Sequence, residues 1–241
     1  MKIIWTFTLL MIPGAVSSIS VGGYSGGVII TCKYDREYTV NAKYFCRGQW
    51  SECTDRIRTN IKNKWVDSGR FSLFDDTTAA VFTVTFRDLS ERDSGTYQCG
   101  VDISGIKDSH TEVNLNVVTD SYYTEVNVNV IRRYSGGNVI INYKYEMNHE
   151  NHEKYFCKTG SYQCITLINT DKAAEWKHVG RFSVHDDRSA RLLRVFIREL
   201  NVDDSGEYKI IVKVSEDYSL FSEFKLDVKK GELLSFVSVV N

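Results

Sequence analysis

The sequence predicts an all-β fold of two tandem β-sandwich domains, and three observations support this prediction. The chain of 241 residues repeats itself with an offset of 111 residues, as from Cys46 to Cys157. Short segments alternate apolar and polar residues with the period of two that half-buried strands show. No window shows a sustained 3.6-residue apolar period. Because the repeat is much longer than a solenoid unit, each copy is expected to be a complete domain with its own core.

Matched motifs define the repeat and its boundaries. We predict a signal peptide over residues 1–18, a first domain over 19–118, a second domain over 119–228 and a tail over 229–241. The corresponding motifs are Tyr44-Phe45-Cys46 and Tyr155-Phe156-Cys157, Gly69-Arg70-Phe71-Ser72 and Gly180-Arg181-Phe182-Ser183, and Asp93-Ser94-Gly95 and Asp204-Ser205-Gly206.

Strands of the first copy are expected over residues 28–32, 43–47, 71–74, 80–86 and 112–118. Their alternation places one set of side chains in the core: Phe82, Val84, Phe86, Val113, Leu115 and Val117. The pairs Asp75-Asp76 and Asp186-Asp187 could suggest calcium. We interpret them as turn residues, since they recur at one place in both copies. Many short strands separated by turns indicate a sandwich or a barrel.

The cysteines favour the sandwich. Cys32 and Cys99 are both replaced in the second copy, by Tyr143 and Ile210, as expected if they are bonded to each other. Their separation of 67 residues, with Tyr97 two residues before Cys99, is typical of the bond between the sheets of an immunoglobulin domain. The sequence thus predicts two immunoglobulin β-sandwich domains; that they are of the V type is implied by the family resemblance given below.

A second kind of cysteine pair occurs in both copies, namely Cys46 with Cys53 and Cys157 with Cys164. Zinc is the rival interpretation, but it needs four ligands at a different spacing, so short disulfides are favoured. In the chain-entropy model the long bridge contributes about 4 kcal/mol and a short one about 2 to 3 kcal/mol. We therefore hypothesise that the second domain is less stable unless Tyr143 and Ile210 pack well.

Two further positions have structural interpretations. Asp93, before the corner tyrosine, is expected to form a salt bridge with Arg70, and the repeat implies the same for Asp204 and Arg181. Phe45, like Phe156 in the second copy, stands where such domains usually carry the core tryptophan.

The two ends indicate export. Lys2, the apolar run Ile3 to Ile12 and the small residues Ala15-Val16-Ser17 form a signal-peptide pattern. Disulfides persist in oxidising compartments, so an extracellular or cell-surface location, or secretion, is expected. The apolar residues 233–240 are too few to cross a bilayer. They are interpreted as a tail, the first strand of a further domain, or the start of a membrane anchor beyond the chain.

Composition excludes several functions. The formal charge of -1 disfavours a nucleic-acid partner, which needs a concentrated positive field. We find no phosphate loop or nucleophile elbow, so no enzyme activity and no cofactor is expected. His149 and His152 lack further zinc ligands, which favours a solvated loop over a metal site. The arginines at 188, 191, 194 and 198 could meet an acidic partner or lipid headgroups, but a solvated sheet face is favoured.

With these residues in view, the chain resembles the V-type domains of the polymeric immunoglobulin receptor and of the CMRF-type leukocyte receptors. Lys43-Tyr44-Phe45-Cys46 with Cys53, and Asp93-Ser94-Gly95-Thr96-Tyr97-Gln98-Cys99-Gly100, carry the resemblance, which covers about residues 20–228. It departs at Phe45 and Phe156 and in the missing cysteines of the second copy.

The resemblance implies that loops at one end of the first domain contact a ligand, which in this family is polymeric immunoglobulin, lipid or another surface molecule. The loops span 35–42, 56–64 and 101–110. We therefore expect the binding part of an immune receptor with a protein ligand or an anionic lipid, and membrane attachment through sequence beyond the chain. The alternatives are an adhesion protein that pairs through sheet faces, and a secreted decoy. The candidate ligand-binding residues are Arg36, Glu37, Tyr38, Asn41, Asp102, Ile106, Lys107 and Asp108.

Overall fold

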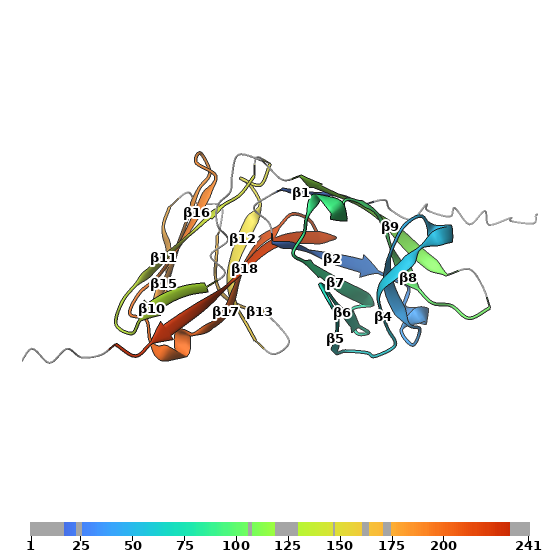
Figure 1. The fold of residues 1–241 in the computed structure, drawn as a ribbon, viewed down its shortest axis with the longest axis horizontal. Helices are drawn as coiled ribbons and strands as arrows, with labels where there is room; N and C mark the ends of the chain where they lie inside the picture. Colours follow the sequence, from blue (N-terminus) through green and yellow to red (C-terminus); the bar gives the residue numbers. More distant parts are fainter. Residues whose placement is uncertain are drawn as a thin grey trace, which may run out of the picture.

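The computed structural model describes residues 17–22, 26–105, 108–118, 130–146, 148–160, 164–170 and 175–231. Their regular structure consists of strands and short 3-10 helices (Figure 1). Within these ranges, no helix is long and apolar enough to cross a membrane. Residues 1–16 of the predicted signal peptide, and residues 232–241 of the predicted tail, lie outside the described part of the chain.

The first domain is a sandwich of two sheets. One has the strand order β1-β9-β8-β3-β4, and the other contains β2-β7-β6-β5. The strands are β1 (Ser17–Gly22), β2 (Gly27–Lys33), β3 (Lys43–Arg47), β4 (Thr54–Thr59), β5 (Trp65–Ser68), β6 (Phe71–Asp76), β7 (Val81–Arg87), β8 (Gly95–Val101) and β9 (Ser109–Val118). The 3-10 helices are η1 (Arg36–Tyr38), η2 (Trp50–Glu52) and η3 (Glu91–Asp93).

The second domain repeats this arrangement. Its sheets contain β13-β12-β17-β18, with β10 parallel to β18, and β11-β16-β15-β14. The elements are β10 (Val130–Tyr134), β11 (Val139–Lys144), β12 (Glu153–Thr159), β13 (Cys164–Asn169), β14 (Lys177–Val179), β15 (Phe182–Asp187), β16 (Leu192–Ile197), η4 (Val202–Asp204), β17 (Gly206–Lys213) and β18 (Tyr218–Lys229). The prediction of two tandem all-β sandwiches is confirmed.

The cores follow the predicted alternation, because the side chains expected inward on β7 and β9 are buried. Phe45 stacks on Tyr97 with ring centroids 5.1 Å apart, and Phe156 stacks on Tyr208 at 5.3 Å. In the second domain Tyr143 and Ile210, which replace the missing cysteines, are 8% and 2% exposed. Both residues belong to the apolar core, so their side chains fill the space between the sheets.

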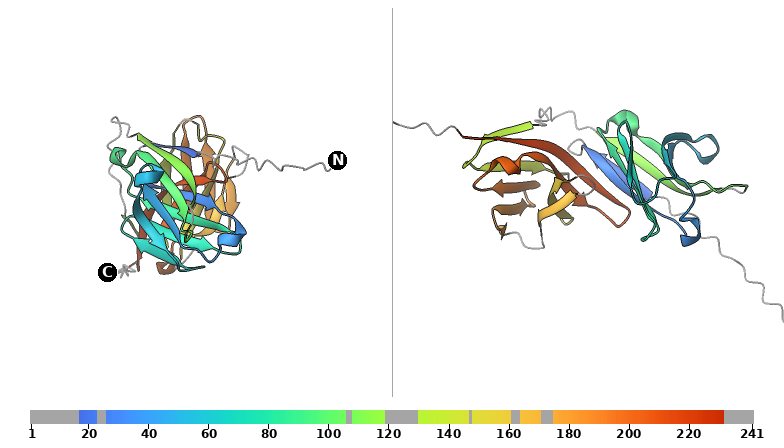
Figure 2. Two further views of the ribbon diagram at one scale, coloured as in Figure 1. Left: turned by 90° about the vertical axis from the view of Figure 1, so that its right-hand side faces the viewer. Right: turned by 90° about the horizontal axis from the view of Figure 1, so that it is seen from below.

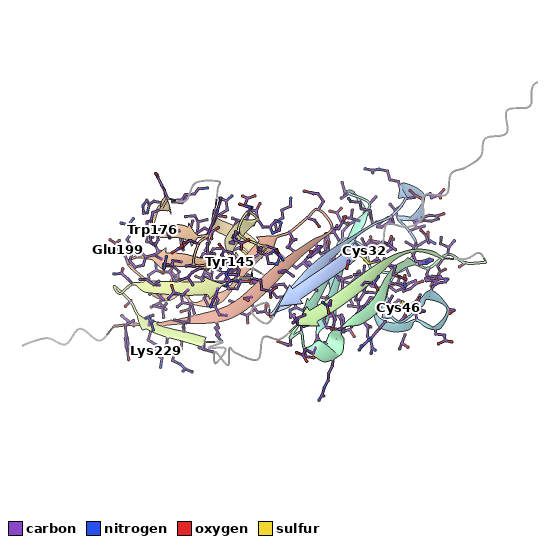
Figure 3. The ribbon with its side chains drawn as sticks, turned by 90° about the horizontal axis from the view of Figure 1, so that it is seen from above. Cys32, Cys46, Tyr145, Trp176, Glu199 and Lys229 are labelled. Carbon is purple, nitrogen blue, oxygen red and sulfur yellow. A yellow bond between two sulfur atoms is a disulfide. The ribbon has the colours of Figure 1, made fainter. Side chains whose placement is uncertain are left out.

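Three disulfides join the cysteines, and no described cysteine is free. Cys32 is bonded to Cys99 across the sheets of the first domain. Figure 3 labels Cys32 and Cys46 in this domain. Each domain also has a short bridge. Cys46 of β3 is bonded to Cys53, directly before β4, and Cys157 of β12 is bonded to Cys164, the first residue of β13. The short bridges close the hairpins β3–β4 and β12–β13.

The turn before β8 is fixed by Asp93. Its carboxylate accepts two hydrogen bonds from Arg70, at 2.7 and 2.8 Å, while its carbonyl accepts the Tyr97 hydroxyl at 2.8 Å. Burial alone would raise the pKa of Asp93, but the hydrogen bonds from Arg70 and Ser90 lower it overall. Arg181 and Asp204 make the same two contacts, at 2.7 and 2.8 Å, in the second domain.

The interpretation of both aspartates in each Asp-Asp pair as turn residues is wrong for Asp75 and Asp186. These residues lie within β6 and β15, and both are buried. Asp76 does form the turn, since its carboxylate accepts the backbone N–H of Thr78 and Ala79 at 2.9 Å. Adjacent residues of a strand point to opposite faces, so one aspartate of each pair faces the interior.

The two domains share one sheet. The first residues of β18 pair antiparallel with β2, which joins four strands of each domain into a nine-stranded sheet that also includes β10. Figure 2 shows the red strand β18 reaching the blue strand β2. The β8–β9 hairpin of the first domain points away from this junction, to the right in Figure 1.

Candidate ligand-binding surface

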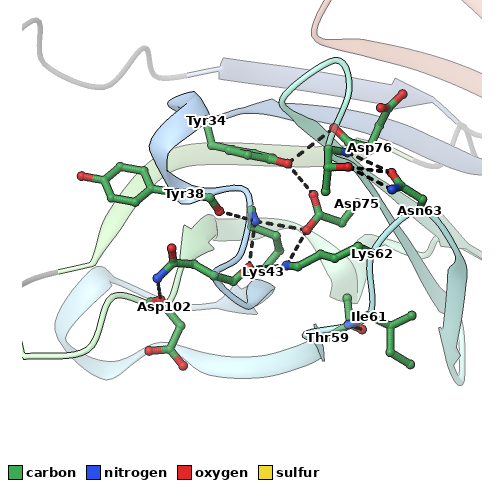
Figure 4. A network of polar contacts seen from close by, with 12 residues as sticks. Tyr34, Tyr38, Lys43, Thr59, Ile61, Lys62, Asn63, Asp75, Asp76 and Asp102 are labelled. Atoms are coloured by element: carbon green, nitrogen blue, oxygen red, sulfur yellow. Dashed lines mark hydrogen bonds and ion pairs between the residues drawn. The ribbon is translucent and has the colours of Figure 1, made fainter.

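The loop between β2 and β3 is held at its base by a buried lysine (Figure 4). Lys43 Nζ donates to the carbonyl oxygens of Tyr38 and Asn41, each at 2.8 Å. It also lies 3.1 Å from Asp75 Oδ2, and neither side chain of this ion pair is exposed. Tyr34 donates its hydroxyl to Asp75 Oδ1 at 2.7 Å and places its ring 4.0 Å from the ammonium. The loop backbone is therefore fixed from below.

The buried charges are balanced by their neighbours. Burial lowers the pKa of Lys43 to about 8, against the opposing hydrogen bond and charge of Asp75. Burial, followed by the hydrogen bond to Asp75, raises the pKa of Tyr34, so its hydroxyl stays protonated. Lys62, from the loop after β4, lies 2.8 Å from Asp75 Oδ2 and donates to the carbonyl of Asn41. This lysine ties the second loop to the first.

The third loop, between β8 and β9, is tied to the same unit. Asn41 Nδ2 donates to the carbonyl oxygen of Asp102 at 2.8 Å. Arg58, on β4, donates to the Asp102 carboxylate at 2.6 Å and to Asp55 at 2.7 Å. Three segments that are far apart in the sequence thus form one continuous surface at the end of the first domain.

The residues predicted to bind a ligand divide into two groups. Arg36 and Glu37, in η1, are exposed, and Tyr38 beside them is half-buried. Asn41, Asp102 and Asp108 instead hold the loops together. Asp108 accepts the Tyr44 hydroxyl at 2.8 Å and the Ile103 N–H at 2.9 Å. Ile106 and Lys107 lie outside the described residues.

The range 56–64, predicted as a loop, is only partly one. Residues 56–59 belong to β4, where Ile57 is buried and pairs with Phe45 of β3. The loop proper begins at Asn60. Arg56 and Arg58 occupy the outward positions of an alternating strand, on either side of the buried Ile57.

Sequence reasoning missed an aromatic cover on the outer face of the same sheet. The segment closed by Cys46–Cys53 folds back over this face, and Trp50 stacks on His110 with centroids 3.8 Å apart. Tyr44 lies beneath, 6.5 Å from Trp50, and Arg58 covers its ring at 4.5 Å. A Cβ at Gly100 would overlap the Tyr44 ring, so glycine permits the ring to lie flat on β8. A tryptophan between two close cysteines was the available signal.

This surface suits recognition of a macromolecule. It combines exposed charges of both signs with half-buried aromatic rings, the composition of protein interfaces. In the described part of the chain, no group of three His, Cys, Asp or Glu side chains is arranged to hold a metal ion.

The second domain repeats the lysine network with different loop residues. Lys154 Nζ donates to the carbonyl oxygens of His149 and His152, at 2.8 and 3.0 Å, and to Asp186 Oδ2 at 2.9 Å. Tyr145 donates to Asp186 Oδ1 at 2.6 Å. The two histidines meet through their Nδ1 atoms, 3.0 Å apart. They stabilise the loop through each other and through Lys154.

The basic run predicted in the second domain lies on β16 and at its two ends: Arg194 is in the strand, Arg188 and Arg191 are in the turn before it, and Arg198 directly follows it. Arg194 pairs with Asp187 at 3.3 Å, and Arg188 lies 4.0 Å from Asp186. Arg198 donates to the carbonyl of Gly180 at 3.0 Å. All of these contacts are made within the second domain, as an ordinary solvated sheet face would show.

Residues 18–118 match the family described as immunoglobulin V-set domain. CMRF35-like molecule 7 of Mus musculus is 36% identical over 45% of this chain and 54% of its own length. The polymeric immunoglobulin receptor of Mus musculus is 26% identical over 75% of this chain and 24% of its own length. A crystal structure of the polymeric immunoglobulin receptor ectodomain from a teleost fish is 25% identical in sequence, with a TM-score of 0.38. The match covers 90% of this chain and 98% of the fish chain.

Residues 18–118 are therefore similar to V-set immunoglobulin domains, and the chain's relatives include CMRF35-like molecules and the polymeric immunoglobulin receptor. The chain spans only about half of the first of these relatives.

Proposed function

We propose that this chain, a V-set domain protein related to CMRF35-like molecules and the polymeric immunoglobulin receptor, is the extracellular ligand-binding part of an immune receptor. One observation carries the proposal: three loops of the first domain are linked through Asn41, Lys62 and Arg58 into one surface. Fixed loops lose little conformational entropy on binding, which favours affinity. The chain would be held at the cell surface by sequence beyond it, or secreted.

The proposed ligand is a protein. Arg36 and Glu37 present opposite charges on an exposed turn. Trp50, stacked on His110 of β9, adds a large aromatic surface. Tryptophan, tyrosine and arginine contribute most to protein interfaces. One relative is a receptor named for polymeric immunoglobulin, so polymeric immunoglobulin is the first ligand to test, followed by anionic lipid.

The test is a binding screen of the soluble tandem against polymeric immunoglobulin and against vesicles containing phosphatidylserine. For a ligand that binds, the double variant Arg36→Ala/Glu37→Ala is expected to weaken binding at least about tenfold, or about 1.4 kcal/mol. The matched control is Glu91→Ala/Arg92→Ala, which removes the same two charges from η3 at the other end of the domain. Equal loss in both variants, or no binding to either probe, would refute the proposal.

Adhesion through sheet faces is the second candidate. Two observations weigh against it. Trp50, in the segment between β3 and β4, covers His110 on the outer face of the first domain's sheet, and β18 of the second domain pairs with the edge strand β2 of the first. Exchanging loops 35–42 and 101–110 distinguishes the candidates. Ligand binding should be lost with self-association unchanged, whereas the reverse result would favour adhesion.

A further inference from the structure

The second domain contacts the first along one strand edge, residues Gly27–Thr31 of β2. In the first domain β1 pairs with β9 and not with β2, so none of its described strands covers this edge. Residues Tyr218–Phe221 of β18, which we call the docking strand, occupy it. An open edge presents unpaired N–H and C=O groups and readily accepts another strand.

The docking strand is held in a defined register. Leu220 pairs with Val28 and Phe221 with Gly27. Just before the strand, the carbonyl oxygen of Asp217 accepts the Thr31 N–H at 2.7 Å. Backbone groups of both domains therefore satisfy one another across the junction.

Phe221 is the apolar anchor of this junction. It is fully buried, yet it does not belong to the apolar core cluster, in contrast to its neighbour Leu220. Its ring lies against Gly27, where an added Cβ would overlap the ring atoms. Lys209 places its ammonium 4.7 Å from the same ring. Because its ring lies between Gly27 of the first domain and Lys209 of the second, Phe221 packs between the domains.

Ion pairs cross the junction on both sides of the docking strand. Lys33 of the first domain lies 3.4 Å from Asp217, and Arg87 lies 3.8 Å from Glu223. Lys209 of the second domain shares Glu223 at 3.5 Å. These partly exposed pairs add little affinity, but opposite charges at both ends favour a single register.

The repeat shows that this junction is specific. The edge equivalent to β2 in the second domain is β11, where Asn138 stands in place of Gly27. The first-domain residues equivalent to Leu220 and Phe221 are Ser109 and His110. His110 is already stacked on Trp50. Gly27 and Phe221, which meet at the junction, are therefore both replaced by other residue types at the equivalent positions of the other domain.

We propose that the docking strand locks the two domains into one rigid unit, so that the loop between β17 and β18 of the second domain contacts the first domain instead of a ligand. Recognition is then confined to the free end of the first domain, which points away from the junction (Figure 1). This inference concerns domain geometry and does not depend on the identity of the ligand.

Hydrogen exchange of the full tandem tests it. Phe221→Ala is expected to raise exchange of the Thr31 amide at least about tenfold and to increase the radius of gyration by small-angle scattering. Phe196→Ala is the matched control, because Phe196 is a partly exposed ring on the outer face of β16, away from the junction. This control should leave both measurements unchanged.

A second variant guards against simple unfolding of the second domain. Asp217→Lys removes no apolar contact but replaces the ion pair with Lys33 by two positive charges. It should raise exchange of the Thr31 amide while the amides of β12 and β17 stay protected. Rapid Thr31 exchange in the unaltered tandem, or equal effects of Phe221→Ala and Phe196→Ala, would overturn the proposal.

Discussion

The bases of the loops before β3 and before β12 are built on the same three residues but differ in the partners of the lysine. Tyr34, Lys43 and Asp75 correspond to Tyr145, Lys154 and Asp186, with the same hydrogen bonds. In the first domain Lys43 donates to the carbonyl oxygens of Tyr38 and Asn41, whose side chains do not titrate near neutral pH. In the second it holds those of two histidines.

The second cation differs as well. Asp75 has Lys62 at 2.8 Å in addition to Lys43, whereas Arg188 lies 4.0 Å from Asp186. The residue equivalent to Lys62 is Ala173. The comparison teaches that a shared frame can carry loops of different strength. The first domain links its loops through two lysines at Asp75, whereas among the described residues of the second domain Lys154 is the only lysine paired with Asp186.

Removal of that lysine is expected to have the largest effect. Lys154→Met leaves Asp186 buried beside a more distant cation, and a broken buried pair costs about 3 to 5 kcal/mol. Lys43→Met should cost less, because Lys62 remains beside Asp75. Native-state hydrogen exchange of the core strands of each domain measures both losses. An equal or greater loss in the first domain would contradict the comparison.

The disulfide difference predicts which domain unfolds first. Cys32→Ala/Cys99→Ala removes the long bridge and should lower the free energy of unfolding of the first domain by about 2 to 4 kcal/mol. In the unaltered chain the second domain, with only its short bridge, should melt first. Calorimetry of both proteins checks the order, and a second domain that outlasts the first in the unaltered chain would show that Tyr143 and Ile210 compensate fully.

The histidine pair predicts an acid-sensitive second domain. Burial, the other histidine and Lys154 lower the pKa of His149, and burial and then Lys154 lower that of His152. A lowered folded-state pKa means that the unfolded chain binds protons more readily. The stability of the second domain is then complete above about pH 6.5 and falls as the pH decreases below it.

Melting of the second domain between pH 7.5 and pH 5 measures this effect. The variant His149→Tyr/His152→Asn, which installs the first-domain residues, should remove most of the decrease. His178→Asn is the control, since that histidine lies on β14, on the other sheet. A decrease that persists unchanged in the double variant would exclude the pair as its source.

The sequence predicted five strands of the first domain, because period-two alternation is local and most of their inward residues are apolar, as Phe82, Val84 and Phe86 show. It could not separate Asp75 from Asp76, since both occupy one polar dipeptide and only the partner Lys43 distinguishes them. The docking strand could not be predicted either, because it too is defined by a partner that is distant in the sequence. Gly27 and Phe221 are far apart in the sequence, and nothing local in either reveals their contact.

The smallest predicted effect lies where the domains are most alike. Arg70 and Arg181 each donate two hydrogen bonds to a turn aspartate, and both guanidiniums are partly exposed. Arg→Lys keeps the charge but removes the forked geometry, so Arg70→Lys and Arg181→Lys should each cost about 1 kcal/mol. Urea denaturation compares the two variants with the parent chain. Losses that agree within about 0.5 kcal/mol support a shared structural role, whereas a clearly larger loss in one domain would mean that its turn also supports the junction between the domains.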